Sequence, residues 1–159
     1  MALPMGSQAP DFTLSTLQGK TTQLSQLRGT PVLLNFFRTD CTWCTVEMPK
    51  LANAFRRHHD VAVHFLGIAS DLDMTLIEGF ANQQQLDFPI LHDINGETMR
   101  AYGIERVPTF IVVDADGSVT RIYEGSSEQL AGIVEQTLMA AARGDELPEY
   151  SLVGNGCAP

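Results

Sequence analysis

The chain has 159 residues, enough for one domain with a complete hydrophobic core. Apolar residues make up 44% and charged residues 18%, as in globular proteins. The formal net charge of -9 argues against a nucleic-acid partner bound through its phosphates, and no apolar run is long enough for a membrane span. The N-terminus lacks the basic and apolar segments of a signal peptide, which leaves a cytoplasmic protein or one without its leader.

The first predicted elements are short. Residues 12–24 predict two strands around a Gln-Gly turn, followed at 24–31 by a brief helical turn that Gly29 and a proline close. Residues 32–37, VLLNFF, form an apolar run that indicates a strand covered on both faces. Helical spacing of apolar residues then predicts a helix from residue 42 to about 58.

The rest of the chain continues this alternation. We expect Asp71 or Asp73 near the N-cap of the next helix, and a capping box of Ser126 and Gln129 before the last one. Further strands are expected at 61–69, 88–93, 109–114 and 118–125, and further helices at 71–85, 95–104 and after Gln129. Strands alternating with helices predict an α/β layered domain with a hairpin at one edge.

The domain is expected to cover residues 1–143. From residue 144 to 159 the sequence contains proline and glycine but has no clear period. We therefore predict an extended C-terminal tail for 144–159. This tail carries Cys157, apart from the other two cysteines.

The segment Cys41-Thr42-Trp43-Cys44 lies between a predicted buried strand and a predicted helix. At the helix start, free backbone N–H groups and the helix dipole lower the pKa of a thiol, so we expect Cys41 to be exposed and reactive. Cys44, one turn further on, could close a disulfide with it. This spacing in an α/β protein predicts thiol–disulfide exchange, in which Cys41 attacks and Cys44 resolves the mixed disulfide.

Two other readings of the cysteine pair are weaker. Two inert buried thiols would be unusual at this spacing. A structural zinc site needs four ligands, and no second CxxC is present. The histidines show no ligand spacing relative to the pair: His58, His59, His64 and His92. We expect no metal and no cofactor.

Several stretches together resemble the TlpA/ResA-like thiol–disulfide oxidoreductases, a branch of the thioredoxin fold. They include APDFTL, LSQLRGTPVLLNFF, C-x-x-C-x-x-E-M-P-x-L and YGIERVPTFIVVDADG, and the resemblance runs from about residue 6 to 139. It implies a thioredoxin-like mixed central sheet flanked by helices, an N-terminal hairpin extension and a helix-strand insertion at 70–95. It also implies that Pro108 is cis, in a loop whose backbone pairs with bound substrate; the alternative is an ordinary strand-entry proline.

The resemblance also gives Glu47 a role. In ResA-like proteins a glutamate three residues after the second cysteine tunes the dithiol and handles protons, and a nearby carboxylate can accept a thiol proton. The alternative is a solvated helix glutamate. Asn35 stands where thioredoxin has a buried aspartate, so residue 35 cannot handle protons, which favours Glu47.

One departure from the family concerns Asp40. The family usually has tryptophan directly before the first cysteine, whereas here the tryptophan is Trp43, between the cysteines. A negative charge beside Cys41 disfavours its thiolate, although Arg38 can offset the effect. We therefore hypothesise a weak oxidant, closer to a reductant.

The expected function is reduction of protein or peptide disulfides, with an upstream dithiol protein as electron donor and no prosthetic group. Most relatives act outside the cytoplasmic membrane, which the resemblance extends to this chain. One alternative is a peroxiredoxin-like thiol peroxidase, but Phe37 and Cys41 stand where its P-x-x-x-T-x-x-C setting needs proline and threonine. Another is a copper-binding protein of related fold, since thiolates suit Cu(I), although such proteins typically use CxxxC.

Cys157 has three readings. It could be a loose thiol, a third redox cysteine that folds back to the dithiol, or half of an intermolecular bridge. Fifteen extended residues reach about 50 Å, so the distance does not exclude the second reading.

Overall fold

The computed structural model of the protein describes residues 3–150 and 153–159. Its strands are β1 (Thr13–Ser15), β2 (Thr21–Gln23), β3 (Val32–Phe37), β4 (His64–Ala69), β5 (Ile90–His92), β6 (Thr109–Val113) and β7 (Val119–Glu124). Its helices are the 3-10 helix η1 (Leu24–Leu27), α1 (Thr42–Arg57), α2 (Met74–Gln83), α3 (Glu97–Ala101) and α4 (Leu130–Arg143).

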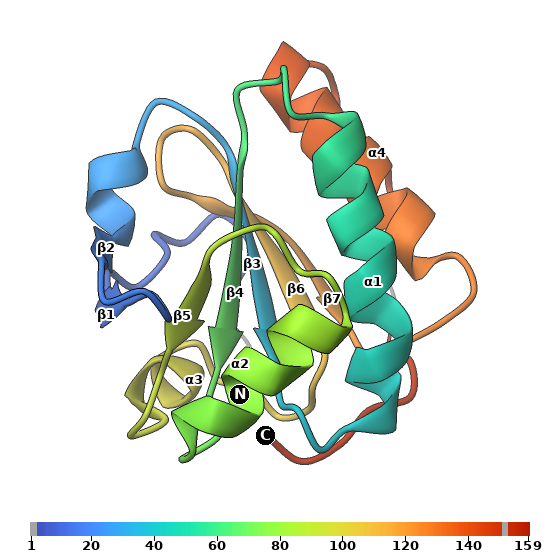
Figure 1. Ribbon diagram of the computed structural model, residues 1–159. Coiled ribbons are helices and arrows are strands. Elements are labelled where there is room, and N and C mark those ends of the chain that lie inside the picture. The colour runs from blue at the N-terminus through green and yellow to red at the C-terminus, as the bar shows by residue number, and fades with distance from the viewer. Residues whose placement is uncertain (1–2, 151–152) are drawn as a thin grey trace.

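A mixed five-stranded sheet with the order β5-β4-β3-β6-β7 forms the centre of the molecule (Figure 1). β3 pairs in parallel with β4 and antiparallel with β6, and β6 and β7 form an antiparallel hairpin. All six residues of β3 are buried, which explains its unbroken apolar sequence, since a central strand has helices or loops over both faces.

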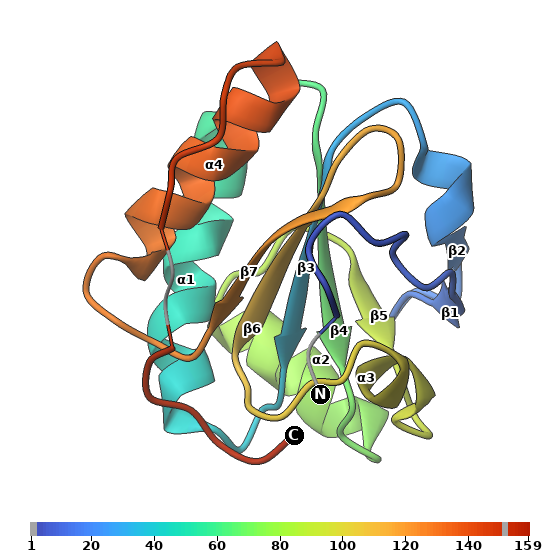
Figure 2. The same ribbon diagram turned by 180° about the vertical axis from the view of Figure 1, so that it is seen from behind.

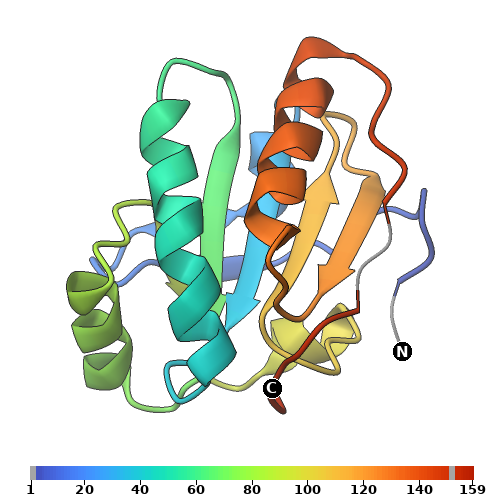
Figure 3. The same cartoon turned by 90° about the vertical axis from the view of Figure 1, so that its right-hand side faces the viewer.

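Helices α1 and α4 lie side by side on one face of the sheet, and α3 and the β1–β2 hairpin lie on the other (Figures 1 and 3). The two long helices are joined at the surface by Arg57 and Glu135, whose charged groups are 2.8 Å apart. α2 packs through Phe80, whose ring stacks on Phe37 at the end of β3. The predicted thioredoxin-like architecture is therefore confirmed, including the hairpin extension and the helix-strand insertion.

The element boundaries differ from the prediction by a few residues. β4 begins at His64 instead of residue 61, because residues 61 to 63 form a tight turn in which Val63 N–H donates to the Val61 carbonyl. α2 is capped by Asp73, whose carboxylate accepts from the Thr75 backbone N–H. Within the described residues, no helix is long and apolar enough to cross a membrane.

The C-terminal tail, residues 145–150 and 153–159, runs along β7 toward the start of α1 (Figures 2 and 3). Near its beginning, the Arg121 side chain donates to the Pro148 carbonyl, and the Tyr150 ring lies against Tyr123. Isolated bridges then join Val153 to Glu124 and other tail residues to the loops beyond β7 and before β6. The tail thus lacks regular structure of its own but has defined partners.

Candidate active site

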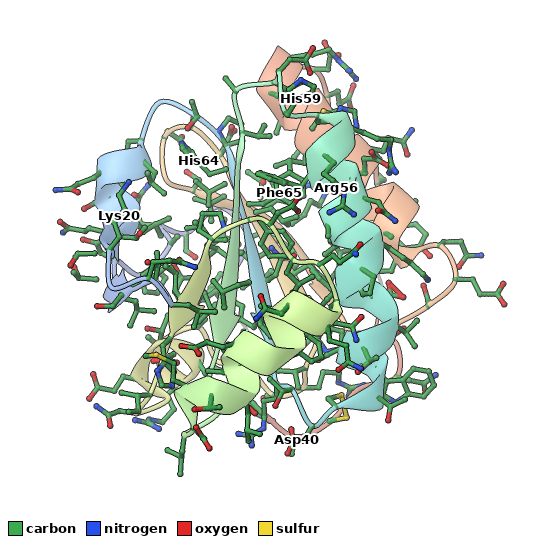
Figure 4. The ribbon with its side chains drawn as sticks, viewed as in Figure 1. Lys20, Asp40, Arg56, His59, His64 and Phe65 are labelled. Carbon is green, nitrogen blue, oxygen red and sulfur yellow. A yellow bond between two sulfur atoms is a disulfide. The ribbon has the colours of Figure 1, made fainter. Side chains whose placement is uncertain are left out.

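The cysteine pair lies where β3 ends and α1 begins. Cys41 is the N-cap residue of α1, and its carbonyl accepts hydrogen bonds from the backbone N–H groups of Cys44 and Thr45 at 3.1 and 3.2 Å. Figure 4 shows the adjacent Asp40 at this end of the molecule, with His59 at the far end of α1. As expected, the first cysteine lies at a helix N-terminus, where the dipole favours a thiolate.

Cys41 forms a disulfide with Cys157, and Cys44 is a free thiol. The expected Cys41–Cys44 bond is therefore not the one in this structure, and the reading of Cys157 as a loose thiol is wrong. The two bonded residues have Cα atoms 5.9 Å apart, well within the range of protein disulfides. The tail brings Cys157 to this position through its backbone pairing with the loop before β6.

That loop contains a cis peptide bond between Val107 and Pro108, as the resemblance implied. Val107 N–H donates to the Cys157 carbonyl, and Cys157 N–H donates to the Val107 carbonyl, both at 2.8 Å. The Val107 carbonyl also lies 3.6 Å from the Cys41 sulfur. An extended segment that carries a cysteine thus pairs with the cis-proline loop while its sulfur is bonded to Cys41.

The exposure of Cys41 differs from the prediction. Only 1% of Cys41 is exposed, whereas Cys157 is partly exposed. The sequence-based expectation of an open sulfur assumed a solvated helix start. Cys157, bonded to Cys41, and the Val107 carbonyl occupy that space instead.

Cys44 is completely buried within α1. The pKa of its thiol is raised to about 12, mainly by burial and also by the carboxylates of Asp71 and Asp40, while a hydrogen bond with the Arg38 backbone and the Arg38 charge lower it. At neutral pH the second cysteine is therefore protonated, so it needs a proton acceptor to act as a nucleophile.

Asp71 is a site residue that sequence reasoning assigned only to a helix cap. Its carboxylate is buried and accepts from the Thr39 backbone N–H and hydroxyl, the latter at 2.7 Å. Its backbone carbonyl contacts His92 Nε2 at 2.7 Å. These bonds tie the loop before Cys41 to the start of the 70–95 insertion.

Asp40 and Arg38 form an ion pair on the surface of the same loop. Arg38 Nε donates to an Asp40 oxygen at 3.0 Å, and these hydrogen bonds lower the pKa of Asp40. Arg38 therefore contacts Asp40 directly, as needed to offset the effect of the Asp40 charge on the Cys41 thiolate. Asp40 remains mostly exposed, with 68% of its side chain accessible.

Glu47 is 1% exposed, which excludes the reading of a solvated helix glutamate. Its Oε1 accepts from the Ser126 hydroxyl at 3.0 Å and from Lys50 Nζ at 3.2 Å, and its buried Oε2 has no hydrogen-bond partner among the described residues. The predicted capping box is wrong: Gln129 is the N-cap of α4, and the Ser126 side chain turns to Glu47 instead. Leaving a buried carboxylate without a donor costs more free energy than leaving an exposed helix end uncapped. The Ser126 hydroxyl therefore donates to Glu47 and does not cap the helix.

The part of the chain that the structure describes holds no group of three or more His, Cys, Asp or Glu side chains suited to a metal ion. The site is thus built from three cysteines, a cis-proline loop and the buried carboxylates of Asp71 and Glu47. This combination can form, exchange and break disulfides.

Comparison with known proteins agrees with this chemistry. Residues 5–122 match the model of the AhpC/TSA family. The thiol-disulfide oxidoreductase ResA of Bacillus anthracis is 32% identical over 136 residues, 84% of this chain and 79% of the relative. ResA of Geobacillus thermodenitrificans is 35% identical over 125 residues, 79% of this chain and 72% of the relative.

Solved structures give the same picture. A putative thiol:disulfide interchange protein DsbE from Chlorobium tepidum is similar, with a TM-score of 0.83 and 26% identity over 89% of this chain and 99% of that one. A secreted Mycobacterium tuberculosis disulfide oxidoreductase homologous to E. coli DsbE has a TM-score of 0.69 and 30% identity over 77% and 93% of the two chains. The chain therefore belongs to the AhpC/TSA family and, within it, to the thiol–disulfide oxidoreductases.

Proposed function

We propose that the protein reduces disulfides in proteins or peptides, with Cys41 as the attacking thiol and Cys44 as a resolving thiol. The observation that carries this proposal is the bond between Cys41 and a cysteine in an extended segment, which pairs with Val107 next to the cis Pro108. A mixed disulfide with a polypeptide substrate would need the same bond and the same backbone pairing.

The two thiols have different tasks. The Cys41 thiolate, favoured by the N-terminus of α1, attacks a substrate sulfur, and one substrate thiol leaves. Cys44 then attacks the Cys41 sulfur, and the second substrate thiol leaves. With a pKa of about 12, only about one Cys44 in 100,000 is ionised at pH 7, so a base is needed. Glu47, one turn along α1 and buried with one oxygen unpaired among the described residues, is our candidate for this base.

The charges near the dithiol support a reductase. A dithiol protein becomes a strong oxidant when its thiolate form is stabilised. Here Asp71 and Asp40 disfavour ionisation of Cys44, and Asp40 also pairs with Arg38, whose charge lowers the pKa of Cys44. These carboxylates weaken the stabilisation of the reduced form by the N-terminus of α1, which favours a reductant, and the electrons are expected to come from an upstream dithiol protein.

The surface around the site supports a polypeptide substrate. Trp43 and Val46 on the first turns of α1 are 37% and 41% exposed. Leu72 and Ile94 line a hollow of about 260 Å³ together with Arg38 and with Pro159 of the tail. Exposed apolar side chains that surround a reactive site are typical of surfaces that bind other proteins.

The decisive test is capture of partners on Cys41. The variant Cys44→Ser combined with Cys157→Ser keeps Cys41 and removes both cysteines that could release a partner. Mixed with a peptide containing one disulfide, it should form a stable adduct that dithiothreitol reverses. The same variant with Cys41→Ser added is the matched control and should form none. An absence of adducts on Cys41 would refute the proposed function.

The direction of the reaction is tested by the reduction potential of Cys41 and Cys44, measured in a Cys157→Ser background. We expect a potential below about -200 mV, which is more reducing than that of dithiol proteins that oxidise their substrates. Adding Asp40→Asn should raise it, because the thiolate then loses a repulsive neighbour. A potential near about -120 mV, as in strong oxidants, would contradict a reductase.

One further variant, Cys41→Ser with Cys44 kept, and one binding measurement address the two alternative functions. A peroxidase needs a reactive thiolate, whereas burial raises the pKa of Cys44 to about 12. Peroxide turnover that persists in Cys41→Ser would nevertheless favour a peroxiredoxin-like activity at Cys44. Stoichiometric Cu(I) binding against a competing chelator would favour copper binding.

A further inference from the structure

The C-terminal tail is held in place by more than its disulfide. Beside the two hydrogen bonds between Cys157 and Val107, Ser126 N–H donates to the Asn155 carbonyl at 2.7 Å, and Asn155 N–H donates back at 3.2 Å. Gly154 N–H donates to the Glu124 carbonyl at 2.6 Å. A short extended segment, residues 153–157, therefore spans the distance from the end of β7 to Cys41.

Side-chain contacts also hold this tail segment in position. Arg106 Nη1 donates to the Gly154 carbonyl at 2.8 Å. Ser126, which pairs with the tail through its backbone, also donates its hydroxyl to the buried Glu47. The docked tail is thus connected through one residue to the carboxylate that follows Cys44 on α1.

The tail sequence fits this position closely. A Cβ atom on Gly154 would lie 2.3 Å from the Ser126 carbonyl oxygen, and one on Gly156 would lie 2.8 Å from the Val107 carbonyl oxygen. Both clashes would be with backbone atoms, which cannot turn aside as a flexible side chain can. The glycines on either side of Asn155 therefore let the tail approach the loops more closely than any other residue would.

We infer that Cys157 is a second resolving cysteine and that the tail is a tethered replacement for the substrate. This inference rests on the proposed function, since it takes Cys41 as the attacking thiol. After Cys41 has attacked a substrate disulfide, the tail displaces the bound polypeptide from the cis-proline loop. Cys157 then takes the place of the substrate sulfur on Cys41, which releases the reduced product.

Each step is an exchange without net oxidation. The Cys157 thiolate attacks the Cys41 sulfur, the Cys41–substrate bond breaks, and the substrate sulfur leaves as a thiolate that takes up a proton. The product is the Cys41–Cys157 bond of this structure, with Cys44 still a thiol. In the next step, either Cys44 attacks Cys41 and frees Cys157, or the thiolate of the upstream dithiol donor attacks Cys157.

Exposure favours the second route. Cys157 is the partly exposed half of the disulfide, and Cys41 is buried. A donor thiolate that attacks Cys157 expels Cys41, which leaves easily because its thiolate lies at the helix N-terminus. The second thiol of the donor then frees Cys157 as a thiol, so the tail receives the electrons that restore the Cys41 thiol, while Cys44 stays reduced.

The first experiment compares Cys44→Ser with Cys44→Ser/Cys157→Ser. After oxidation by a peptide disulfide with no added reductant, the single variant should contain an intramolecular Cys41–Cys157 bond, found by peptide mass mapping, and should have released the peptide in its reduced form. The double variant should stop after one event with the peptide bound to Cys41. Partner capture should be at least about tenfold lower in the single variant.

The outcomes separate this inference from the proposed function. If the single variant captures peptide as fully as the double variant, the second resolving role is wrong, while the function of Cys41 stands. If the double variant captures nothing, the proposed function itself fails. Cys41 remaining a free thiol in the oxidised single variant would also refute the tail disulfide.

A second experiment tests docking without removing a sulfur. Gly154→Ala should shift the oxidised protein from the Cys41–Cys157 bond toward the Cys41–Cys44 bond by about tenfold, because close backbone pairing is lost. Asn155→Ala is the matched control, since the Asn155 side chain is exposed and its pairing is made by the backbone. An equal distribution of the two disulfides in Gly154→Ala and the control would overturn the docked geometry.

Discussion

The two edges of the central sheet are covered by different ends of the chain. At the β5 edge, Thr16 bridges to Leu91, and the hairpin that contains β1 and β2 packs its apolar side chains against the core. Phe12, at its start, is buried and meets the Tyr102 ring edge-on. This cover is part of the hydrophobic core and cannot leave without exposing apolar surface.

At the β7 edge the cover is the tail, which is attached mainly by polar contacts. Val153 is 62% exposed where it bridges to Glu124, and Tyr150 supplies a ring contact with Tyr123. Hydrogen bonds hold Gly154 and Asn155, and backbone hydrogen bonds together with the disulfide hold Cys157. Since water can replace such hydrogen bonds at little net cost, the tail can undock while the domain stays folded.

Truncating the core-side cover should give the largest effect. Phe12→Ala is expected to lower the free energy of unfolding by about 3–5 kcal/mol, in oxidised and in reduced protein alike, because it leaves a cavity beside Tyr102. Denaturant titration in both redox states measures this. For comparison, Tyr150→Ala should cost far less under reducing conditions. Equal losses for the two variants would remove the distinction between a fixed and a movable cover.

The burial of Cys44 should appear in its reaction with alkylating agents. With the tail disulfide intact, labelling of Cys44 by iodoacetamide at pH 8 should be at least about 1,000-fold slower than in unfolded protein, since its pKa rises from 9.0 to about 12.

The raised pKa of Cys44 also makes the free energy of unfolding depend on pH. Between pH 9 and 12 the unfolded thiol ionises while the folded one does not, so stability should fall by about 1.4 kcal/mol per pH unit. Rapid labelling near pH 9 in folded protein would contradict this environment.

The contrast between the two edges also explains which features the sequence could predict. Apolar runs such as residues 32–37 identify buried strands, because burial on both faces leaves a periodic signal in side-chain type. The position of Cys41 at the start of α1 followed from the same periodicity. The tail docks through backbone groups, which every residue has, so its sequence shows only the two glycines around Asn155.

Residues whose partners lie far apart in sequence were also missed. Ser126 was assigned to a local capping box because Gln129 follows at the right spacing, yet its hydroxyl donates to Glu47, 79 positions away. Asp71 was assigned to a cap, although its carboxylate bonds to Thr39. Local patterns do not contain the long-range packing that decides between such alternatives.

The link between the tail and the core can be broken at Ser126. Ser126→Ala removes the hydroxyl from the buried Glu47 and is expected to destabilise the protein by about 1–3 kcal/mol, because a buried carboxylate loses one of its two donors and keeps only Lys50. The backbone pairs with Asn155 should remain. Thermal unfolding of the reduced protein measures the loss. Ser127→Ala, next to it in the same loop, is the control, and an equal loss there would mean that the loop and not the Glu47 contact is responsible.

The smallest effect should come from Arg106, whose side chain donates a hydrogen bond to the tail. Arg106→Ala removes one hydrogen bond to the Gly154 carbonyl, worth about 1 kcal/mol, and should leave the stability of the reduced domain nearly unchanged. In the oxidised protein it should lower the ratio of the Cys41–Cys157 bond to the Cys41–Cys44 bond by about fivefold, as measured by mass mapping after acid quenching. Arg100→Ala, which removes a similar surface contact to the Asn95 carbonyl, should not alter this ratio. A loss of stability in reduced Arg106→Ala as large as that of Ser126→Ala would show that the tail is part of the folded core after all, and the two edges of the sheet would then be covered in the same way.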